Sequence, residues 1–223
     1  DYPDLDRAAT AAAYAIFFNQ GEMCSAGSRL LVQRAARDAV LEKVAAIGRA
    51  MAPGDPLDPA TKLGAIVDET QMKRVLGYID KGKSEGARCV VGGGRPKAFP
   101  KGWYVEPTLF ADVDNRMTIA QEEIFGPVLC AIPYDDEADA LRIANDSEYG
   151  LSGSVWTSDA SRGLEIARRV RTGTYNVNYF MLAMGGPCGG FKSSGLGREL
   201  GPEGLRAYLE PKTICFAPSS EPK

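Results

Sequence analysis

The segment FFNQGEMCSAGSR, residues 17–29, places one cysteine among small and polar residues directly after an apolar run. A cysteine thiolate is a soft nucleophile, so Cys24 can attack an electrophilic carbon if it is ionised and accessible. Gly21, Ser25 and Gly27 leave room for a ligand near the backbone, and their N–H groups can hold a negative oxygen. The same pattern fits an inert thiol at the end of a helix, and the residues alone leave both interpretations open.

The segment QEEIFGPV, residues 121–128, is the second candidate, with two adjacent carboxylates before an aromatic residue and a Gly-Pro break. The break leads into an apolar stretch that is predicted to form a buried strand. Functional loops of parallel sheets follow the carboxyl ends of strands, whereas these carboxylates precede one. From the residues alone, a cap or a surface role is therefore favoured over catalysis.

Two glycine-rich segments raise the question of phosphate binding. The dinucleotide fingerprint requires a strand, G-x-G-x-x-G and then a helix. Residues 92–94 are followed by Arg95 and Pro96, which indicates a turn. The segment GGPCGG, residues 185–190, has no helix signal after it, so an active-site loop and a tight turn both remain open.

The composition excludes several kinds of site. The 223 residues contain no histidine, which excludes a histidine-assisted nucleophile and a histidine-ligated metal within this chain, and we predict no metal. The five cysteines form no CxxC pair, so free thiols in a reducing cytoplasm are predicted rather than a disulfide scaffold. The net charge of −3 gives no sign of a nucleic-acid partner, and no apolar run is long enough for a membrane span.

Strands alternate with helices along most of the chain, and this predicts an α/β fold. Helices are expected over 5–18, 37–50, 68–84, 135–147, 159–173 and 203–209, and strands over 28–33, 88–94, 126–134, 153–158, 174–179 and 212–217. Such a pattern is typical of a three-layer αβα arrangement, in which a mostly parallel sheet carries helices on both faces.

Taken together, these segments resemble the NAD(P)-dependent aldehyde dehydrogenase family. FFNQGEMCSAGSR is similar to the segment that carries the family's catalytic cysteine, and EEIFGPV is similar to its second signature. Four further segments match in order: ANDSEYGLSGSVWT (144–157), RTGTYNVN (171–178), GGFKSSGLGRELGPEGL (189–205) and YLEPKT (208–213). One such motif would be weak, but six in the right order cover nearly the whole chain.

The resemblance implies a role for each candidate residue. Cys24 would be the catalytic nucleophile, and Glu123 and Phe125 would contact the nicotinamide ribose of NAD or NADP. A general-base role for Glu123 is the alternative, which the family pattern makes less favourable. The substrate tunnel would be lined by Phe18, Met23, Tyr179, Phe180, Leu182, Met184 and Cys188, with Cys188 where an aromatic residue is common in the family.

The resemblance also predicts the domain organisation. Residues 1–197 would form the catalytic domain, and residues 198–223 a C-terminal helix and an oligomerisation strand that contact a cofactor domain or another subunit. Family members form homodimers or homotetramers through such a strand. The chain opens without Met on an acidic turn, so we expect the C-terminal half of a longer enzyme. Its own N-terminal domain would supply the coenzyme-binding segment, an oxyanion-hole Asn and the general-base Glu.

The sequence leaves three functions to be distinguished. The first is oxidation of an aldehyde to a carboxylic acid through a cysteine thiohemiacetal and thioester, with hydride transfer to NAD(P)+ and an isolated chain that is inactive. The second is a relative that hands the thioester to coenzyme A. The third is a non-catalytic interaction module that retains the fold.

Overall fold

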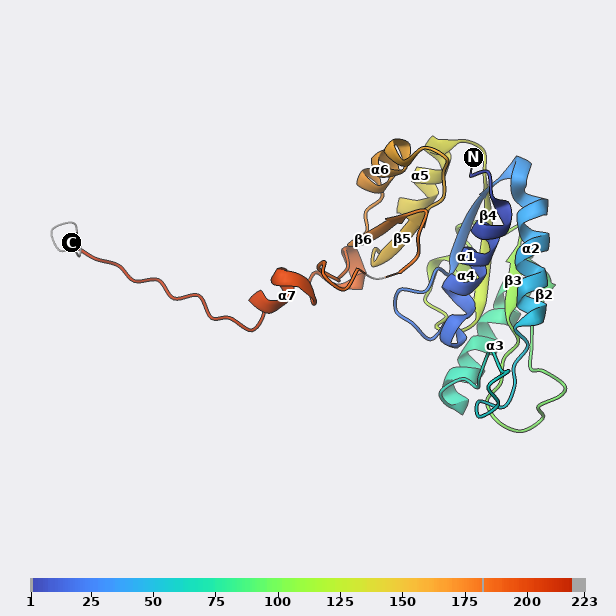
Figure 1. Ribbon diagram of the computed structural model, residues 1–223. Coiled ribbons are helices and arrows are strands. Elements are labelled where there is room, and N and C mark those ends of the chain that lie inside the picture. Colours follow the sequence, from blue (N-terminus) through green and yellow to red (C-terminus); the bar gives the residue numbers. More distant parts are fainter. Residues whose placement is uncertain (1, 182, 218–223) are drawn as a thin grey trace.

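The computed structural model describes residues 2–181 and 183–217, which form an α/β body with a C-terminal extension (Figure 1). The helices are α1 (Leu5–Phe17), α2 (Arg37–Ala50), α3 (Glu69–Ser84), α4 (Thr118–Gln121), α5 (Glu137–Asn145), α6 (Ala160–Arg169) and α7 (Gly201–Arg206). The strands are β1 (Arg29–Gln33), β2 (Arg88–Val91), β3 (Thr108–Ala111), β4 (Val128–Tyr134), β5 (Ser152–Val155) and β6 (Thr174–Val177).

The strands form a four-stranded sheet in the order β1-β4-β3-β2 and a separate pair, β5-β6. β1, β4 and β3 are parallel, β2 runs antiparallel to β3, and β5 is parallel to β6. The prediction of a mostly parallel sheet is therefore confirmed. Within the described residues, however, no strand ladder joins the β5-β6 pair to the larger sheet.

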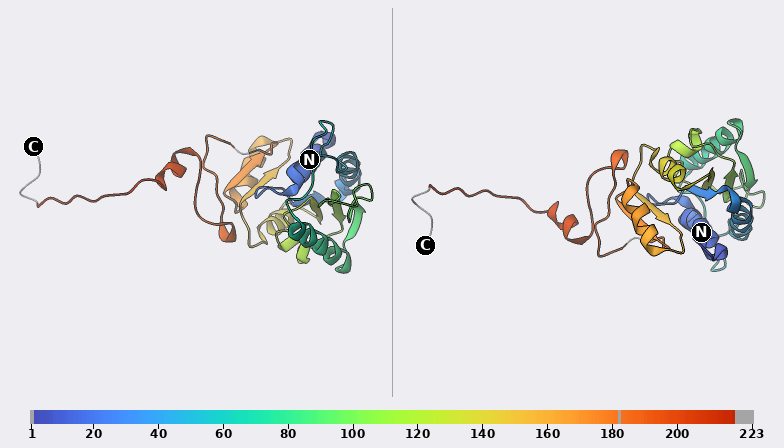
Figure 2. Two further views of the ribbon diagram at one scale, coloured as in Figure 1. Left: turned by 90° about the horizontal axis from the view of Figure 1, so that it is seen from below. Right: turned by 90° about the horizontal axis from the view of Figure 1, so that it is seen from above.

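Helices cover both faces of the four-stranded sheet, which confirms the three-layer arrangement (Figure 2). Successive side chains of a strand point to opposite faces. On β4, Val128, Cys130 and Ile132 therefore pack towards α3 and α4, whereas Leu129 and Ala131 pack towards α1 and α2. Because both faces are covered, β4 consists almost entirely of buried residues.

The helices α1, α3, α5 and α6 each begin at an aspartate cap that the sequence displays. The carboxylate of Asp4 accepts a hydrogen bond from the Arg7 N–H at 2.9 Å, and Asp68 accepts one from Gln71 at 2.7 Å. Asp136 caps α5 in the same way. A side chain at this position satisfies one of the N–H groups that the first helical turn leaves unpaired. The start of each of these helices was therefore predictable to within one or two residues.

The predicted final strand at residues 212–217 is absent: the segment is exposed and forms no strand. Beyond α7 the chain runs away from the body, without a neighbouring strand beside it (Figure 1). A strand is defined by hydrogen bonds to a neighbour, so a β-prone sequence alone does not form one. The pairing of this segment with another subunit stays a prediction.

Candidate active site

Cys24 lies in a turn between α1 and β1, where its side chain is exposed. The chain leaves α1 through three successive residues with positive φ, namely Asn19 (50°), Gln20 (58°) and Gly21 (71°). Positive φ is uncommon for residues other than glycine and costs free energy. The backbone thus adopts a strained conformation in order to present the turn that carries the cysteine.

Backbone hydrogen bonds attach the end of this turn to the body. The Gly27 N–H donates to the carbonyl of Ala15 in α1 at 2.9 Å. The carbonyl of Ser28 accepts a hydrogen bond from the Cys130 N–H of β4, also at 2.9 Å. The turn is therefore fixed between α1 and β4, one of the two inner strands of the sheet.

A close approach between two glycines brings the cysteine turn against the EEIFGPV segment. A Cβ atom at Gly21 would lie 2.2 Å from the carbonyl oxygen of Gly126 and 2.9 Å from the nitrogen of Pro127. These atoms belong to backbone, which cannot move aside as a flexible side chain can. The two segments, about a hundred residues apart in the sequence, are therefore neighbours in the structure.

Two side chains of α3 hold the loop that contains Glu123 and Phe125. The side-chain amide of Gln71 donates to the carbonyls of Ile124 at 3.0 Å and Phe125 at 2.7 Å. The guanidinium of Arg74 donates to the carbonyl of Glu123 at 2.8 Å. Phe125 itself has a φ of 57°, so this loop also needs support from outside itself.

Replacing Gln71 with leucine is expected to lower the free energy of unfolding by about 2 kcal/mol, because two partly buried carbonyls lose their donor. Urea denaturation followed by circular dichroism measures the change. Lys73→Leu is the matched control on the same helix, because its ion pair with Glu69 is exposed, and we expect about 0.5 kcal/mol or less. Equal losses in the two variants would show that Gln71 does not support the loop.

The two adjacent carboxylates of the EEIFGPV segment have different surroundings. Glu122 accepts a hydrogen bond from the Tyr78 hydroxyl at 2.7 Å. Burial, together with this hydrogen bond, raises the pKa of Tyr78, so the hydroxyl remains a donor. Glu123 is exposed, and no hydrogen bond or ion pair holds its carboxylate within the described part of the chain. Glu123 is therefore the carboxylate that is available to a ligand.

A cavity of about 810 Å³ lies between α1, β1, α5, β5 and the EEIFGPV loop. Five of the residues that the sequence singled out line it: Met23, Cys24, Glu123, Phe125 and Phe180. Phe180 is held close to the cysteine turn, since a Cβ at Gly27 would lie 3.6 Å from its ring. The structure thus brings a thiol, a free carboxylate and two aromatic rings around one space.

The other predicted tunnel residues are placed differently. Phe18, Tyr179 and Met184 are exposed and Cys188 is half-buried, and none of the four lines this cavity. Leu182 lies outside the described residues. Their roles in a substrate tunnel stay predictions.

The five cysteines are all free thiols with different surroundings. Cys130 is fully buried, and burial raises its pKa to about 12. Burial also raises the pKa of the Cys89 thiol. The pKa of the Cys188 thiol is raised mainly by burial and further by the nearby charges of Glu199 and Cys24. Burial therefore disfavours the thiolate form of these three thiols, whereas Cys24 and Cys215 are the two exposed cysteines.

Two supporting residues of the site escaped the sequence analysis. The side-chain oxygen of Gln20 accepts a hydrogen bond from the Gly64 N–H at 3.3 Å, and the Glu22 carboxylate accepts one from the Val67 N–H at 3.2 Å. Burial is the main reason why the pKa of Glu22 is raised. The sequence signal for both residues was the polar tract between the apolar helix and Cys24. Polar side chains that become partly buried when such a loop folds need hydrogen-bond partners.

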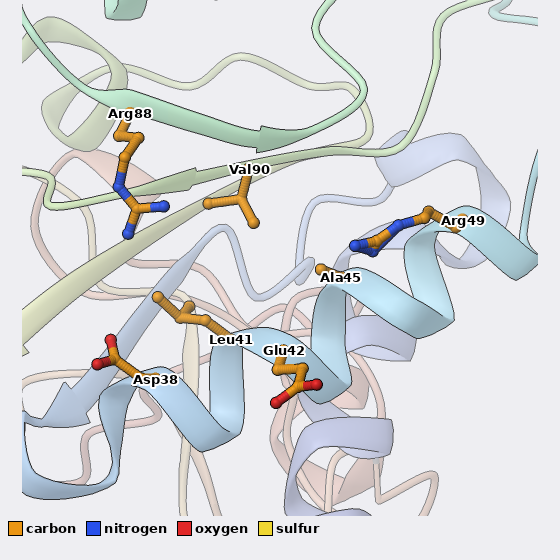
Figure 3. A pocket seen from close by; sticks show the side chains of 7 residues that line it. All are labelled: Asp38, Leu41, Glu42, Ala45, Arg49, Arg88 and Val90. Atoms are coloured by element: carbon orange, nitrogen blue, oxygen red, sulfur yellow. The ribbon is translucent and has the colours of Figure 1, made fainter.

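A second, smaller cleft of about 410 Å³ lies between α2 and β2 (Figure 3). It is lined by Asp38, Leu41, Glu42, Ala45, Arg49, Arg88 and Val90. Arg88 is already paired with Asp112 at 2.9 Å. None of these lining residues is a cysteine, so the chemistry expected of Cys24 belongs to the larger cavity.

In residues 2–181 and 183–217, no group of three or more acidic or cysteine side chains is arranged to hold a metal ion. Over the same ranges, none of the helices combines the length and the apolar character that a bilayer crossing requires.

Comparison with known proteins gives consistent matches. The betaine aldehyde dehydrogenase of Sinorhizobium fredii is 45% identical over 216 residues, covering 96% of this chain and 44% of the relative. The geranial dehydrogenase of Castellaniella defragrans is 46% identical, with 95% of this chain and 44% of the relative covered. A crystal structure of a Mycobacterium tuberculosis aldehyde dehydrogenase complexed with NAD+ is 50% identical, with a TM-score of 0.91 over 93% of this chain and 43% of that one.

The chain thus spans about 44% of the length of the curated relatives that it matches. A family model described as the aldehyde dehydrogenase family matches residues 1–214. With nearly every residue inside that match, this chain belongs to the aldehyde dehydrogenase family.

Proposed function

We propose that this chain supplies the nucleophile and part of the coenzyme site of an NAD(P)-dependent aldehyde dehydrogenase that converts an aldehyde to a carboxylic acid. The observation that carries the proposal is that the exposed thiol of Cys24 shares one cavity with Glu123 and Phe125. The similar Mycobacterium tuberculosis enzyme, which was crystallised with NAD+, supports a nicotinamide coenzyme. The five free thiols support a reducing compartment such as the cytoplasm.

Cys24 carries out the covalent part of the reaction. Its thiolate attacks the aldehyde carbon, a C–S bond forms, and the carbonyl π electrons move to the oxygen. The Cys24 N–H donates to this oxyanion. A nicotinamide coenzyme, which Glu123 and Phe125 would help to hold, would supply the hydride acceptor, and loss of hydride from the same carbon would leave a thioester on the Cys24 sulfur. Water then cleaves the C–S bond, so that the acid is released and the thiol is restored.

The residues on the cavity wall fit a nicotinamide riboside. A ribose presents vicinal hydroxyls, and the unpaired carboxylate of Glu123 can accept hydrogen bonds from both. Phe125 offers an apolar ring beside it, and two side chains of α3 hold these residues through the backbone, Arg74 at Glu123 and Gln71 at Phe125. Because the carboxylate of Glu123 has this binding role, we assign general-base catalysis to a different residue, as the family resemblance implies.

The chain forms only part of the proposed enzyme. We propose residues 1–197 as the catalytic domain and residues 198–223 as the part that contacts a cofactor domain or another subunit of a homodimer or homotetramer. In the described part of this region, Tyr208, Ile214 and Phe216 are exposed apolar side chains that such a contact would bury. We expect the 223-residue chain alone to oxidise aldehydes poorly, because the resemblance places the oxyanion-hole Asn and the general base in another domain.

The polypeptide that contains this chain is expected to prefer octanal to succinic semialdehyde. The apolar and aromatic residues of the cavity, such as Phe125, Trp156 and Phe180, favour an uncharged aldehyde chain over a carboxylate. NADH formation with each aldehyde, with NAD+ present and coenzyme A absent, measures kcat/KM. A marked preference for succinic semialdehyde would contradict the apolar tunnel, and turnover that requires coenzyme A would favour the acyl-transferring alternative.

A further inference from the structure

A side chain from β5 reaches the peptide directly after the nucleophile. The Ser152 hydroxyl donates to the Ser25 carbonyl at 3.1 Å, across 127 residues of sequence. Ser25 is 8% exposed, so its carbonyl has little access to water and depends on this donor. Because Ser25 is bonded to Cys24, the hydrogen bond acts on the turn that carries the thiol.

Ser25 lies inside a turn that one backbone hydrogen bond closes. The Ala26 N–H donates to the Met23 carbonyl at 3.1 Å, and Cys24 and Ser25 occupy the two central positions. The Ser25 carbonyl and the Ala26 N–H belong to the same peptide group, which this closing hydrogen bond already orients. The Ser152 hydroxyl holds the other end of that peptide from β5, and so reinforces the turn conformation that the Met23 hydrogen bond closes.

The residues directly before Ser152 are held by the GGFKSSG segment, residues 189–195. The Phe191 N–H donates to the Gly150 carbonyl at 2.7 Å, and the Gly150 N–H donates to the Ser194 hydroxyl at 3.0 Å. The ammonium of Lys192 donates to the carbonyl of Ser147 at 2.8 Å. These hydrogen bonds therefore hold residues 147–150 in place, directly before the start of β5.

We propose that Ser152 is a positioning residue for Cys24: its hydroxyl fixes the turn so that the thiol faces the cavity. The inference rests on the proposed function, because it concerns the same nucleophile. It adds a residue on β5, which is separated from the β1-β4-β3-β2 sheet by the cavity, and it makes the reactivity of Cys24 depend on the placement of β5.

Ser154 provides a matched comparison within the same strand. Residues two apart in a strand lie on the same face, and both Ser152 and Ser154 line the cavity. Within the described residues, the Ser154 hydroxyl forms no hydrogen bond, whereas that of Ser152 reaches the cysteine turn. Ser152→Ala and Ser154→Ala each remove one hydroxyl from β5, but only Ser152→Ala removes the hydrogen bond to the cysteine turn.

The test is the rate at which iodoacetamide alkylates Cys24 in the 223-residue chain, measured by mass spectrometry of the peptide that contains residue 24. Loss of one hydrogen bond of about 1 kcal/mol corresponds to a roughly fivefold lower population of the reactive conformer. We therefore expect about fivefold slower alkylation in Ser152→Ala, wild-type rates in Ser154→Ala, and recovery in Ser152→Thr, which restores a hydroxyl. Alkylation of the buried Cys130 in the same digest reports any general unfolding.

The outcomes separate this inference from the proposed function. If wild-type Cys24 reacts no faster than the exposed Cys215, the proposed nucleophile itself is wrong. If wild-type Cys24 reacts fast and Ser152→Ala leaves its rate within twofold or raises it, only the positioning role is overturned. An equal loss in Ser154→Ala, no recovery with threonine, or a parallel rise in Cys130 labelling would also overturn it.

Discussion

Replacing Cys24 with serine is expected to lower aldehyde oxidation by the enzyme that contains this chain at least about 1,000-fold. A serine hydroxyl fits the same turn, but it is far less ionised than a thiol at neutral pH and needs an adjacent base to activate it. No histidine is present anywhere in the chain to take that role. NADH formation under saturating octanal and NAD+ measures the loss in kcat.

Cys215→Ser is the control for this substitution, because Cys215 is the other exposed thiol but lies far along the C-terminal extension. It is expected to retain wild-type turnover. In the 223-residue chain, one rapid addition of iodoacetamide should disappear in Cys24→Ser and persist in Cys215→Ser. Activity within tenfold of wild type in Cys24→Ser would mean that a different atom attacks the aldehyde.

The layers of the fold were predictable because local signals and burial agree in them. The carboxylates of Asp4 and Asp68 stand where the helices begin. The continuous apolar run of β4 reflects a strand that is covered on both faces, which is typical of a parallel sheet between helices. The separation of the β5-β6 pair from the larger sheet has no such local signal, because it depends on how distant segments dock.

The residue types of the site were predictable, but their arrangement was not. The sequence singled out Cys24, Glu123 and Phe125, yet nothing in it shows that Gln71 holds the Glu123 loop through backbone carbonyls. Hydrogen bonds from a side chain to a distant backbone leave no periodic pattern. The same holds for Ser152, which lay inside a matched segment without a role of its own.

Replacing Gly21 with alanine is expected to lower the free energy of unfolding by about 3 kcal/mol, through overpacking of the contact and a left-handed backbone that carries a Cβ. The added Cβ would lie 2.2 Å from the Gly126 oxygen, and the φ of Gly21 is 71°. The added Cβ clashes with backbone atoms, so relief requires the cysteine turn or the Glu123 loop to shift. Urea denaturation measures the stability, and alkylation of Cys24 reports the shift of the turn.

Gly77→Ala is the matched control, because Gly77 lies inside α3 with no atom within 4 Å of an added Cβ. Alanine in the interior of a helix is favoured over glycine, so this variant is expected to gain up to about 1 kcal/mol. Opposite signs for the same chemical change would show that the cost at position 21 comes from its contact with Gly126 and not from the methyl group. If Gly21→Ala is as stable as wild type and its Cys24 reacts normally, the two signature segments do not depend on this contact, and the arrangement of the cavity needs a different explanation.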